Sequence, residues 1–222
     1  MELASAIASD VSGICRGIFS IQVVPPGWIH FELTHSTLAT WLQSLVVGSL
    51  GGDEGTIDAP CPMPHAPCPM PNSLFAVQYA HARCCSLVLL AHREGLIKLR
   101  EPVPNTSPAF WSVIAPNPIP WLNCDRTLRL NHPDERQLIA ELVQVVDNIE
   151  CPDVSGSVKW EKVALNLSQA FEKFWSNCRI WGEVKITSPE VAQARLGLLM
   201  ATQSVLRYVL EENLGVFAPL EL

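Results

Sequence analysis

Apolar residues recur at helical spacing through most of the second half of the chain. Between residues 73 and 93 they form a stripe with a period near 3.6 residues, with polar residues on the opposite side. Similar stripes predict helices over 133–146 and 159–178. A further helix is expected to begin at Pro189, which follows a serine cap, and to end before Gly215. These patterns predict a mainly α fold.

The first 49 residues follow a different pattern. A predicted helix over 4–18 precedes two runs of strand-forming residues, 19–24 and 28–33, which flank a Pro-Pro-Gly turn. Thr34 or Ser36 then caps a second helix. We therefore expect a small α/β segment, in the order helix, strand, strand, helix, before the helical part of the chain.

A proline-rich linker is predicted over 50–73, between this segment and a helical domain over 74–222. It contains APCPMPH followed directly by APCPMPN, and proline at this density favours an extended chain. Cys61, His65 and Cys68 have the spacing C-x3-H-x2-C, but a structural zinc site needs four ligands on a folded segment. We interpret the three residues as a product of the repeat and expect no metal.

A second proline-rich stretch interrupts the helical domain. Residues 101–130 hold six prolines, with Phe110, Trp111 and Trp121 between them. Proline removes backbone donors and ends helices, so we expect a long loop. Its aromatic side chains are predicted to lie across the helical core.

Composition limits the classes of protein to consider. The chain has 222 residues, 48% of them hydrophobic, which is enough to bury a core. No run reaches the roughly 18 apolar residues of a membrane span, and the N-terminus MELASAIASD lacks the charged and apolar regions of a signal peptide. Cys84 and Cys85 are neighbours among eight cysteines, which favours reduced thiols over a set of disulfides. We expect a cytoplasmic protein without a membrane partner.

The charge is unevenly distributed. A net charge of −7 opposes general binding of nucleic acid, because phosphate contacts supply most of that affinity. Residues 1–72 hold one basic residue, Arg16, and six acidic ones, whereas residues 79–100 hold four basic residues and only Glu94. Any contact with RNA should therefore be local and centred on the second region.

Several segments resemble class I arginyl-tRNA synthetases, in the same order. FAVQYAHARCCSL (75–87) resembles the helix that leads from the catalytic domain of that family into its anticodon-binding domain. ALNLSQAFEKFWSNCRI (164–180), ARLGLLMATQSVL (194–206) and the final LGVFAPLEL continue the likeness to a DALR-type anticodon-binding domain. GWIHF (27–31) resembles a strand near the end of the family's N-terminal tRNA-binding domain. The resemblance implies an anticodon-binding helical bundle and a remnant of the N-terminal domain.

The resemblance also implies tRNA, in particular arginine tRNA, as a partner. It suggests an RNA surface along the predicted helix 73–93, where an aromatic ring and guanidinium groups share the polar side. A second part is expected at the far end of the bundle, where Leu222 replaces the family's terminal methionine. A third lies in the N-terminal segment, where His30 replaces the family's asparagine. The residues expected to contact RNA are Tyr79, Arg83, Arg93, Trp175, Arg179, Leu222, Trp28, His30 and Phe31.

No catalytic residues are predicted. The sequence contains no HIGH-like nucleotide signature, no KMSK loop and no glycine-rich phosphate loop, so we expect no cofactor. The leading interpretation is a non-catalytic tRNA-binding protein related to arginyl-tRNA synthetase. The alternative is a protein-interaction or regulatory scaffold that has lost RNA binding. The acidic net charge, Leu222 and His30 favour the alternative, whereas the FAVQYAHAR helix with Arg83 favours the first.

Overall fold

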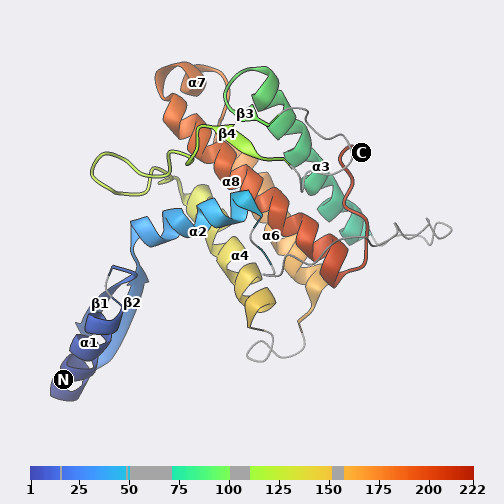
Figure 1. Cartoon of the computed structure of the whole chain (residues 1–222). Helices are drawn as coiled ribbons and strands as arrows, with labels where there is room; N and C mark the ends of the chain where they lie inside the picture. Colours follow the sequence, from blue (N-terminus) through green and yellow to red (C-terminus); the bar gives the residue numbers. More distant parts are fainter. Residues whose placement is uncertain (16, 49, 51–71, 101–110, 152–157) are drawn as a thin grey trace.

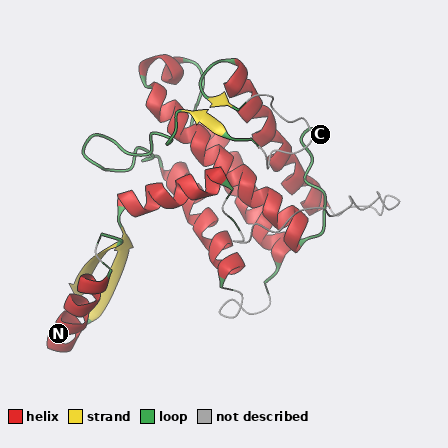
Figure 2. Ribbon diagram, in the orientation of Figure 1, coloured by secondary structure: helices red, strands yellow, loops and turns green. Residues whose placement is uncertain are grey.

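The long helices of the C-terminal part pack into a bundle (Figure 1). The computed structural model describes residues 1–15, 17–48, 50, 72–100, 111–151 and 158–222. The principal helices of the bundle are α3 (Asn72–Arg93), α4 (Pro133–Glu150), α6 (Trp160–Asn177) and α8 (Pro189–Tyr208). The prediction of a mainly α fold is confirmed, and Figure 2 shows how little strand accompanies the helices.

Helix α8 is the centre of the bundle. It contacts α2 (His35–Val47), α3, α4 and α6, and it is buried along almost its whole length because small and apolar residues occupy every side of it. Its last turn widens into a π-helix over Val209–Asn213, before Gly215 adopts a positive φ of 62°. The helical segment therefore ends just before Gly215, as the sequence predicts.

Helix α3 combines a buried side with an exposed one. Val77, Ala80, Cys84, Val88 and Ala91 lie in the core, as the apolar stripe predicts. The segment Leu74–Arg93 is long and apolar enough to cross a bilayer, yet more than half of it is buried inside the protein. Packing against α6 and α8 therefore accounts for its apolar character.

The N-terminal segment forms the predicted helix, two strands and helix. Helix α1 (Glu2–Ile14) is followed by the antiparallel hairpin of β1 (Phe19–Val24) and β2 (Trp28–Leu33). Both strands have the predicted bounds. Helix α1 ends four residues earlier than predicted, because the chain turns after Cys15 and Gly17 has a left-handed φ of 81°.

Helix α2 connects this hairpin unit to the bundle. The Oγ1 atom of Thr34 accepts a hydrogen bond from the backbone N–H of Thr37 and so caps the helix. Leu42, Leu45 and Val46 are buried, and α2 packs against α8. The unit formed by α1, β1 and β2 lies apart from the bundle, at the outer end of α2 (Figure 1).

The proline-rich loop covers the core with aromatic rings, as predicted. Trp111 and Trp121 are buried, whereas Phe110 lies outside the described residues. Gln43 of α2 fastens the loop, since its Oε1 atom accepts hydrogen bonds from Trp121 Nε1 at 2.9 Å and from the backbone N–H of Ile119 at 3.0 Å. The repeat with Cys61, His65 and Cys68 also lies outside the described residues.

Within the described ranges, three short elements were not predicted. Strand β3 (Lys98–Leu99) pairs with β4 (Val113–Ala115), and α7 (Glu183–Thr187) forms one short helix before α8. Elements of two to five residues are too short to show a period in the sequence. They depend on the bundle, against which α7 and the buried Leu99 pack.

Candidate nucleic-acid interface on helix α3

The exposed side of α3 presents an aromatic ring and two guanidinium groups in one row. Tyr79, Arg83 and Arg93 are all exposed, and helical spacing places them on the same side as Ser86 and Leu90. At 1.5 Å per residue, Arg83 and Arg93 are separated by about 15 Å along the helix. Stacking and ionic groups therefore follow a path long enough for several nucleotides.

Helix α6 borders this row on one side. The guanidinium carbon of Arg83 lies 5.3 Å from the centre of the Trp175 ring, which is the geometry of a cation–π contact. Trp175 in turn contacts Trp181 edge to face, with 5.8 Å between ring centres. Trp175 is half-buried, so it supports Arg83 as well as offering part of its own ring to solvent.

The C-terminal tail borders the row on the other side. Gln78 Nε2 donates a hydrogen bond to the carbonyl oxygen of Phe217 at 2.8 Å. One turn further along α3, His81 Nδ1 donates to the carbonyl oxygen of Pro219, also at 2.8 Å. The tail therefore runs beside α3 in the same direction, and the exposed side chain of Leu222 follows these two contacts.

The buried His81 is a site residue that the sequence analysis did not identify. Its Nδ1–H bonds Pro219, so its Nε2 atom accepts a hydrogen bond from the Gln203 amide at 3.0 Å. Burial lowers the pKa of His81 from its ordinary 6.5 to about 4, so the ring is neutral at physiological pH. Its partners are more than 120 residues away in the sequence, and for that reason no local pattern indicates the role.

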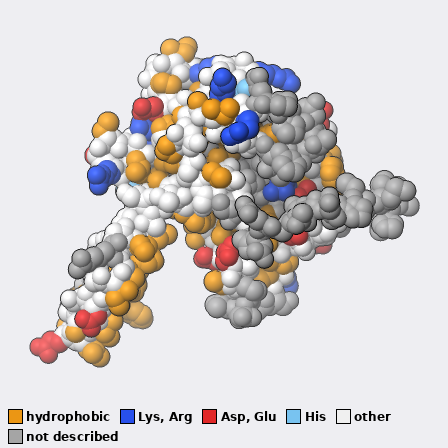
Figure 3. Space-filling model, in the orientation of Figure 1, with side chains coloured by type: hydrophobic (Ala, Val, Ile, Leu, Met, Phe, Trp, Pro, Cys, Tyr) orange, Lys and Arg blue, Asp and Glu red, His pale blue; other side chains and the backbone are white. Residues whose placement is uncertain are grey.

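Cations without acidic partners continue the row beyond the end of α3. Among the described residues, Arg83, Arg93, Lys98 and Arg100 form no ion pair, whereas Lys185 is paired with Glu94 at 2.8 Å. Lys and Arg side chains gather at the end of the bundle where β3, β4 and α7 lie (Figure 3). The acidic net charge therefore coexists with a local basic region.

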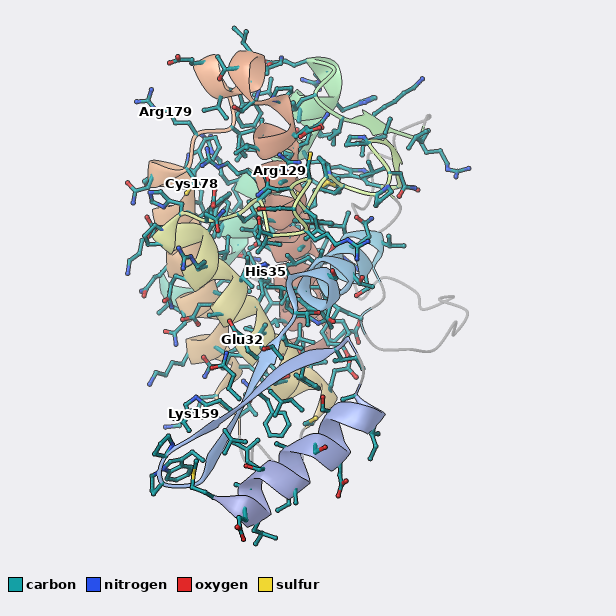
Figure 4. The ribbon with its side chains drawn as sticks, turned by 90° about the vertical axis from the view of Figure 1, so that its left-hand side faces the viewer. Glu32, His35, Arg129, Lys159, Cys178 and Arg179 are labelled. Atoms are coloured by element: carbon teal, nitrogen blue, oxygen red, sulfur yellow. The ribbon has the colours of Figure 1, made fainter. Side chains whose placement is uncertain are left out.

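Arg179 projects from the same end of the bundle. Figure 4 shows its side chain pointing away from the protein, with Lys159 at the opposite end of the bundle. The backbone at this point is held firmly, because Arg195 Nη1 donates to the carbonyl oxygen of Arg179 at 2.7 Å. Arg195 Nε also bonds the buried carboxylate of Glu135 at 2.6 Å.

The structure does not bring the three predicted residues of the N-terminal segment next to Tyr79 and Arg83. Trp28, His30 and Phe31 all lie on β2, in the unit apart from the bundle (Figure 1). They also lie on two faces of the hairpin. Alternation along the strand places Phe31 on one face and Trp28 and His30 on the other.

The exposed groups of the candidate site are aromatic rings and guanidinium groups. Burial raises the pKa of the Cys84 thiol well above its usual range and that of Cys85 to about 12, so neither is a thiolate at neutral pH. Across the described ranges no group of three or more His, Cys, Asp or Glu side chains could hold a metal ion. Exposed rings and guanidinium groups can stack on bases and pair with phosphates.

Comparison with known proteins identifies the family of the bundle. Residues 77–222 match the DALR anticodon binding domain. Over 149 residues, the chain is 32% identical to the arginine–tRNA ligases of Synechococcus sp. (strain JA-3-3Ab) and Moorella thermoacetica and 28% identical to that of Ruminiclostridium cellulolyticum. Each match covers 67% of this chain and 22% of the relative, so the chain spans about a fifth of the length of the curated relatives it matches. No solved structure matches the chain. The match over most of its length shows that the chain belongs to the DALR anticodon-binding domain family.

Proposed function

We propose that this protein binds tRNA through the exposed side of α3 and does not itself catalyse aminoacylation. The main support for this proposal is the arrangement of side chains on α3. Tyr79 and Arg83 share the exposed side of a helix in the DALR domain, and Arg83 is held over the ring of Trp175. A guanidinium with a fixed orientation loses less conformational freedom when it pairs with a phosphate or a base edge.

The physical basis of binding is a combination of stacking and local charge. A ring that stacks on a base contributes roughly 1–3 kcal/mol, whatever the base. A guanidinium can bind a phosphate through two parallel hydrogen bonds. Arg93, Lys98 and Arg100, which form no ion pair with any described residue, extend this surface, so a few phosphates can be neutralised despite the net charge of −7.

Arginine tRNA is the ligand that the relatives support. The curated relatives are arginine–tRNA ligases, and their similarity covers the part of the chain that contains α3, α6 and α8. The absence of HIGH-like and KMSK motifs from these 222 residues supports a binding role without catalysis. Free tRNA is found in the cytoplasm, which is the location we propose.

Binding of arginine tRNA, measured by fluorescence anisotropy at low salt, tests this proposal. Arg83→Ala should weaken binding by about tenfold, since charged hydrogen bonds contribute about 1.5–3 kcal/mol. Arg126→Ala is the matched control, because it removes another exposed arginine, in the loop before α4. Equal affinities for wild type and Arg83→Ala would exclude this face as the RNA site. If wild-type protein binds no tRNA at low salt, the bundle is a protein-interaction scaffold instead.

The absence of catalysis is tested separately. Purified protein supplied with ATP, arginine and tRNA should form no arginyl-tRNA above a control without protein, because no residues match the nucleotide-binding signatures. Expression in a host whose own synthetase can be removed by an affinity tag excludes contamination. Arginyl-tRNA that persists after that removal would show a catalytic activity that the sequence motifs do not indicate.

A further inference from the structure

The unit formed by α1, β1 and β2 has no buried core. None of the residues of α1 is buried, and no residue of either strand is buried. A two-stranded hairpin is marginally stable in water and needs further strands or a packed helix to form a hydrophobic layer. Helix α1 contacts the hairpin, but this contact leaves the layer incomplete.

Helix α1 covers the β1 half of the hairpin and leaves the β2 half open. The register places six apolar residues on one face: Phe19, Ile21, Val23, Ile29, Phe31 and Leu33. Their partners on the helix are the half-buried Ala4, Ala8 and Val11, at helical spacing. The three residues of β1 are half-buried, whereas Phe31 and Leu33 of β2 are 50% and 39% exposed.

A second apolar stripe on α1 lies next to this uncovered half. Leu3, Ile7 and Ile14 are exposed, and helical geometry places them beside the stripe that faces the sheet. Figure 3 shows hydrophobic side chains gathered along the β2 side of the unit. We call these three residues, together with Phe31 and Leu33, the N-terminal apolar patch.

The charge around the patch disfavours RNA as its occupant. Residues 1–48 contain Glu2, Asp10 and Glu32 but a single basic residue, Arg16. Affinity for nucleic acid depends on neutralising phosphates, for which several cations are needed. An apolar surface with a weak negative charge instead fits another protein surface of the same apolar character.

We propose that the N-terminal apolar patch binds the same patch of a second copy of this chain. Within the described ranges, β2 pairs with β1 and its other edge pairs with no strand. Two copies related by a two-fold axis perpendicular to the sheet pair β2 with β2 in antiparallel fashion. The result is a four-stranded sheet in the order β1-β2-β2-β1, with both α1 helices on one face. Phe31, near the middle of β2, lies next to its counterpart at the axis.

The dimensions of this arrangement agree with known packing distances. Neighbouring strands lie about 4.8 Å apart, so the two β1 strands are separated by about 14 Å. Each α1 also contacts its own β2, which brings the two helices closer to the roughly 10 Å of packed helices. The large side chains of the patch fill the space between them. Two patches together cover on the order of 1,000 Å² of apolar surface, the size at which specific interfaces begin.

Sedimentation equilibrium of the full chain at micromolar concentrations tests the proposal. Wild type is expected to dimerise reversibly. Phe31→Glu places a charge at the centre of the interface and should raise the dissociation constant by about tenfold or more. Gln22→Glu is the matched control, because it places the same charge on the opposite face of the hairpin, on β1 and away from the paired β2 edges, and should leave the dimer intact. Circular dichroism confirms that the bundle remains folded in both variants.

Amide hydrogen exchange provides a second measurement. Raising the protein concentration should protect amides of β2 and leave those of α3 and α8 unchanged. A wild type that stays monomeric, or equal effects of Phe31→Glu and Gln22→Glu, overturns the proposal. A monomer in which Phe31→Glu weakens tRNA binding also overturns it and identifies RNA as the occupant of the patch.

Discussion

The guanidinium of Arg83 lies over the ring of Trp175, and this contact couples two side chains expected to bind RNA. Removal of the tryptophan ring would free Arg83 as well as removing a stacking surface. The effects of changing the two residues should therefore not be additive, as is usual for residues in direct contact. Helical periodicity predicted the exposed position of Arg83, but the contact with α6 depends on a residue 92 positions later in the chain.

The buried His81 makes the stability of the folded protein sensitive to pH. Its pKa is about 4 in the folded protein and about 6.5 in the unfolded chain. The unfolded chain therefore binds the proton first, and stability that is fully present above pH 6.5 is lost as the pH falls towards 4. The loss from this residue reaches about 3 kcal/mol below pH 4.

Urea unfolding at pH 7.5, 5.5 and 4.5 tests the role of His81. Carboxylates also take up protons in this range, so the informative quantity is the difference between wild type and His81→Gln. Glutamine does not titrate and keeps an amide donor near Pro219, so the variant should lose less stability than wild type as the pH falls. The other groups facing the ring are Gln203, Cys85 and Arg207, of which Arg207 carries a permanent positive charge that further disfavours protonation. Parallel losses in the two proteins would show that His81 does not cause the pH dependence.

At the scale of elements, close contact with one glycine fixes the loop on the bundle. A Cβ atom at Gly197 of α8 would lie 2.6 Å from Cη2 of Trp121 and 2.8 Å from Cγ2 of Ile119. The absence of a side chain therefore lets the buried indole ring pack directly on the helix backbone. Gln43 holds the same ring through its Nε1–H, so the ring has little freedom to move away.

Gly197→Ala is expected to destabilise the protein by about 1–3 kcal/mol, the usual cost of overpacking a core. Alanine is intrinsically better than glycine in a helix by about 1 kcal/mol, so the steric cost is partly offset. Gly13→Ala in α1 is the matched control, because its Cβ would have no atom within 4 Å and should stabilise the helix. Thermal unfolding followed by circular dichroism distinguishes the two. If Gly197→Ala were more stable than wild type, the indole ring of Trp121 would be able to move away from the added methyl group.

Elements set by local interactions were predicted from the sequence, whereas features that depend on contacts between distant segments were not. Strands β1 and β2 were predicted to the residue because alternation and the turn sequence are local signals. Gly197 carries no such signal, since its role depends on a tryptophan that packs on it from another segment. The same holds for His81, and for the position of β2, with Trp28, His30 and Phe31, apart from α3.

At the scale of the whole molecule, the distribution of charge should determine how salt affects tRNA binding. Each phosphate contact contributes roughly −0.7 to −0.9 to the slope of log K against log salt concentration. Within the described part of the chain, the cations of the proposed surface that form no ion pair are Arg83, Arg93, Lys98, Arg100 and Arg179, so the slope should be no steeper than about −4.5. A general polyanion-binding protein would show a steeper dependence.

The double variant Lys98→Ala/Arg100→Ala tests whether this local region, and not the net charge, governs binding. It should make the slope shallower by about 1.5, because two phosphate contacts are lost. Lys159→Ala/Lys162→Ala changes the net charge by the same amount at the opposite end of the bundle, where Figure 4 places Lys159, and should leave the slope unchanged. All four of these side chains are exposed, so neither double variant should alter the fold. Equal changes in the two variants would show that tRNA responds to the overall charge of the protein, and the surface on α3 would then have no special part in binding.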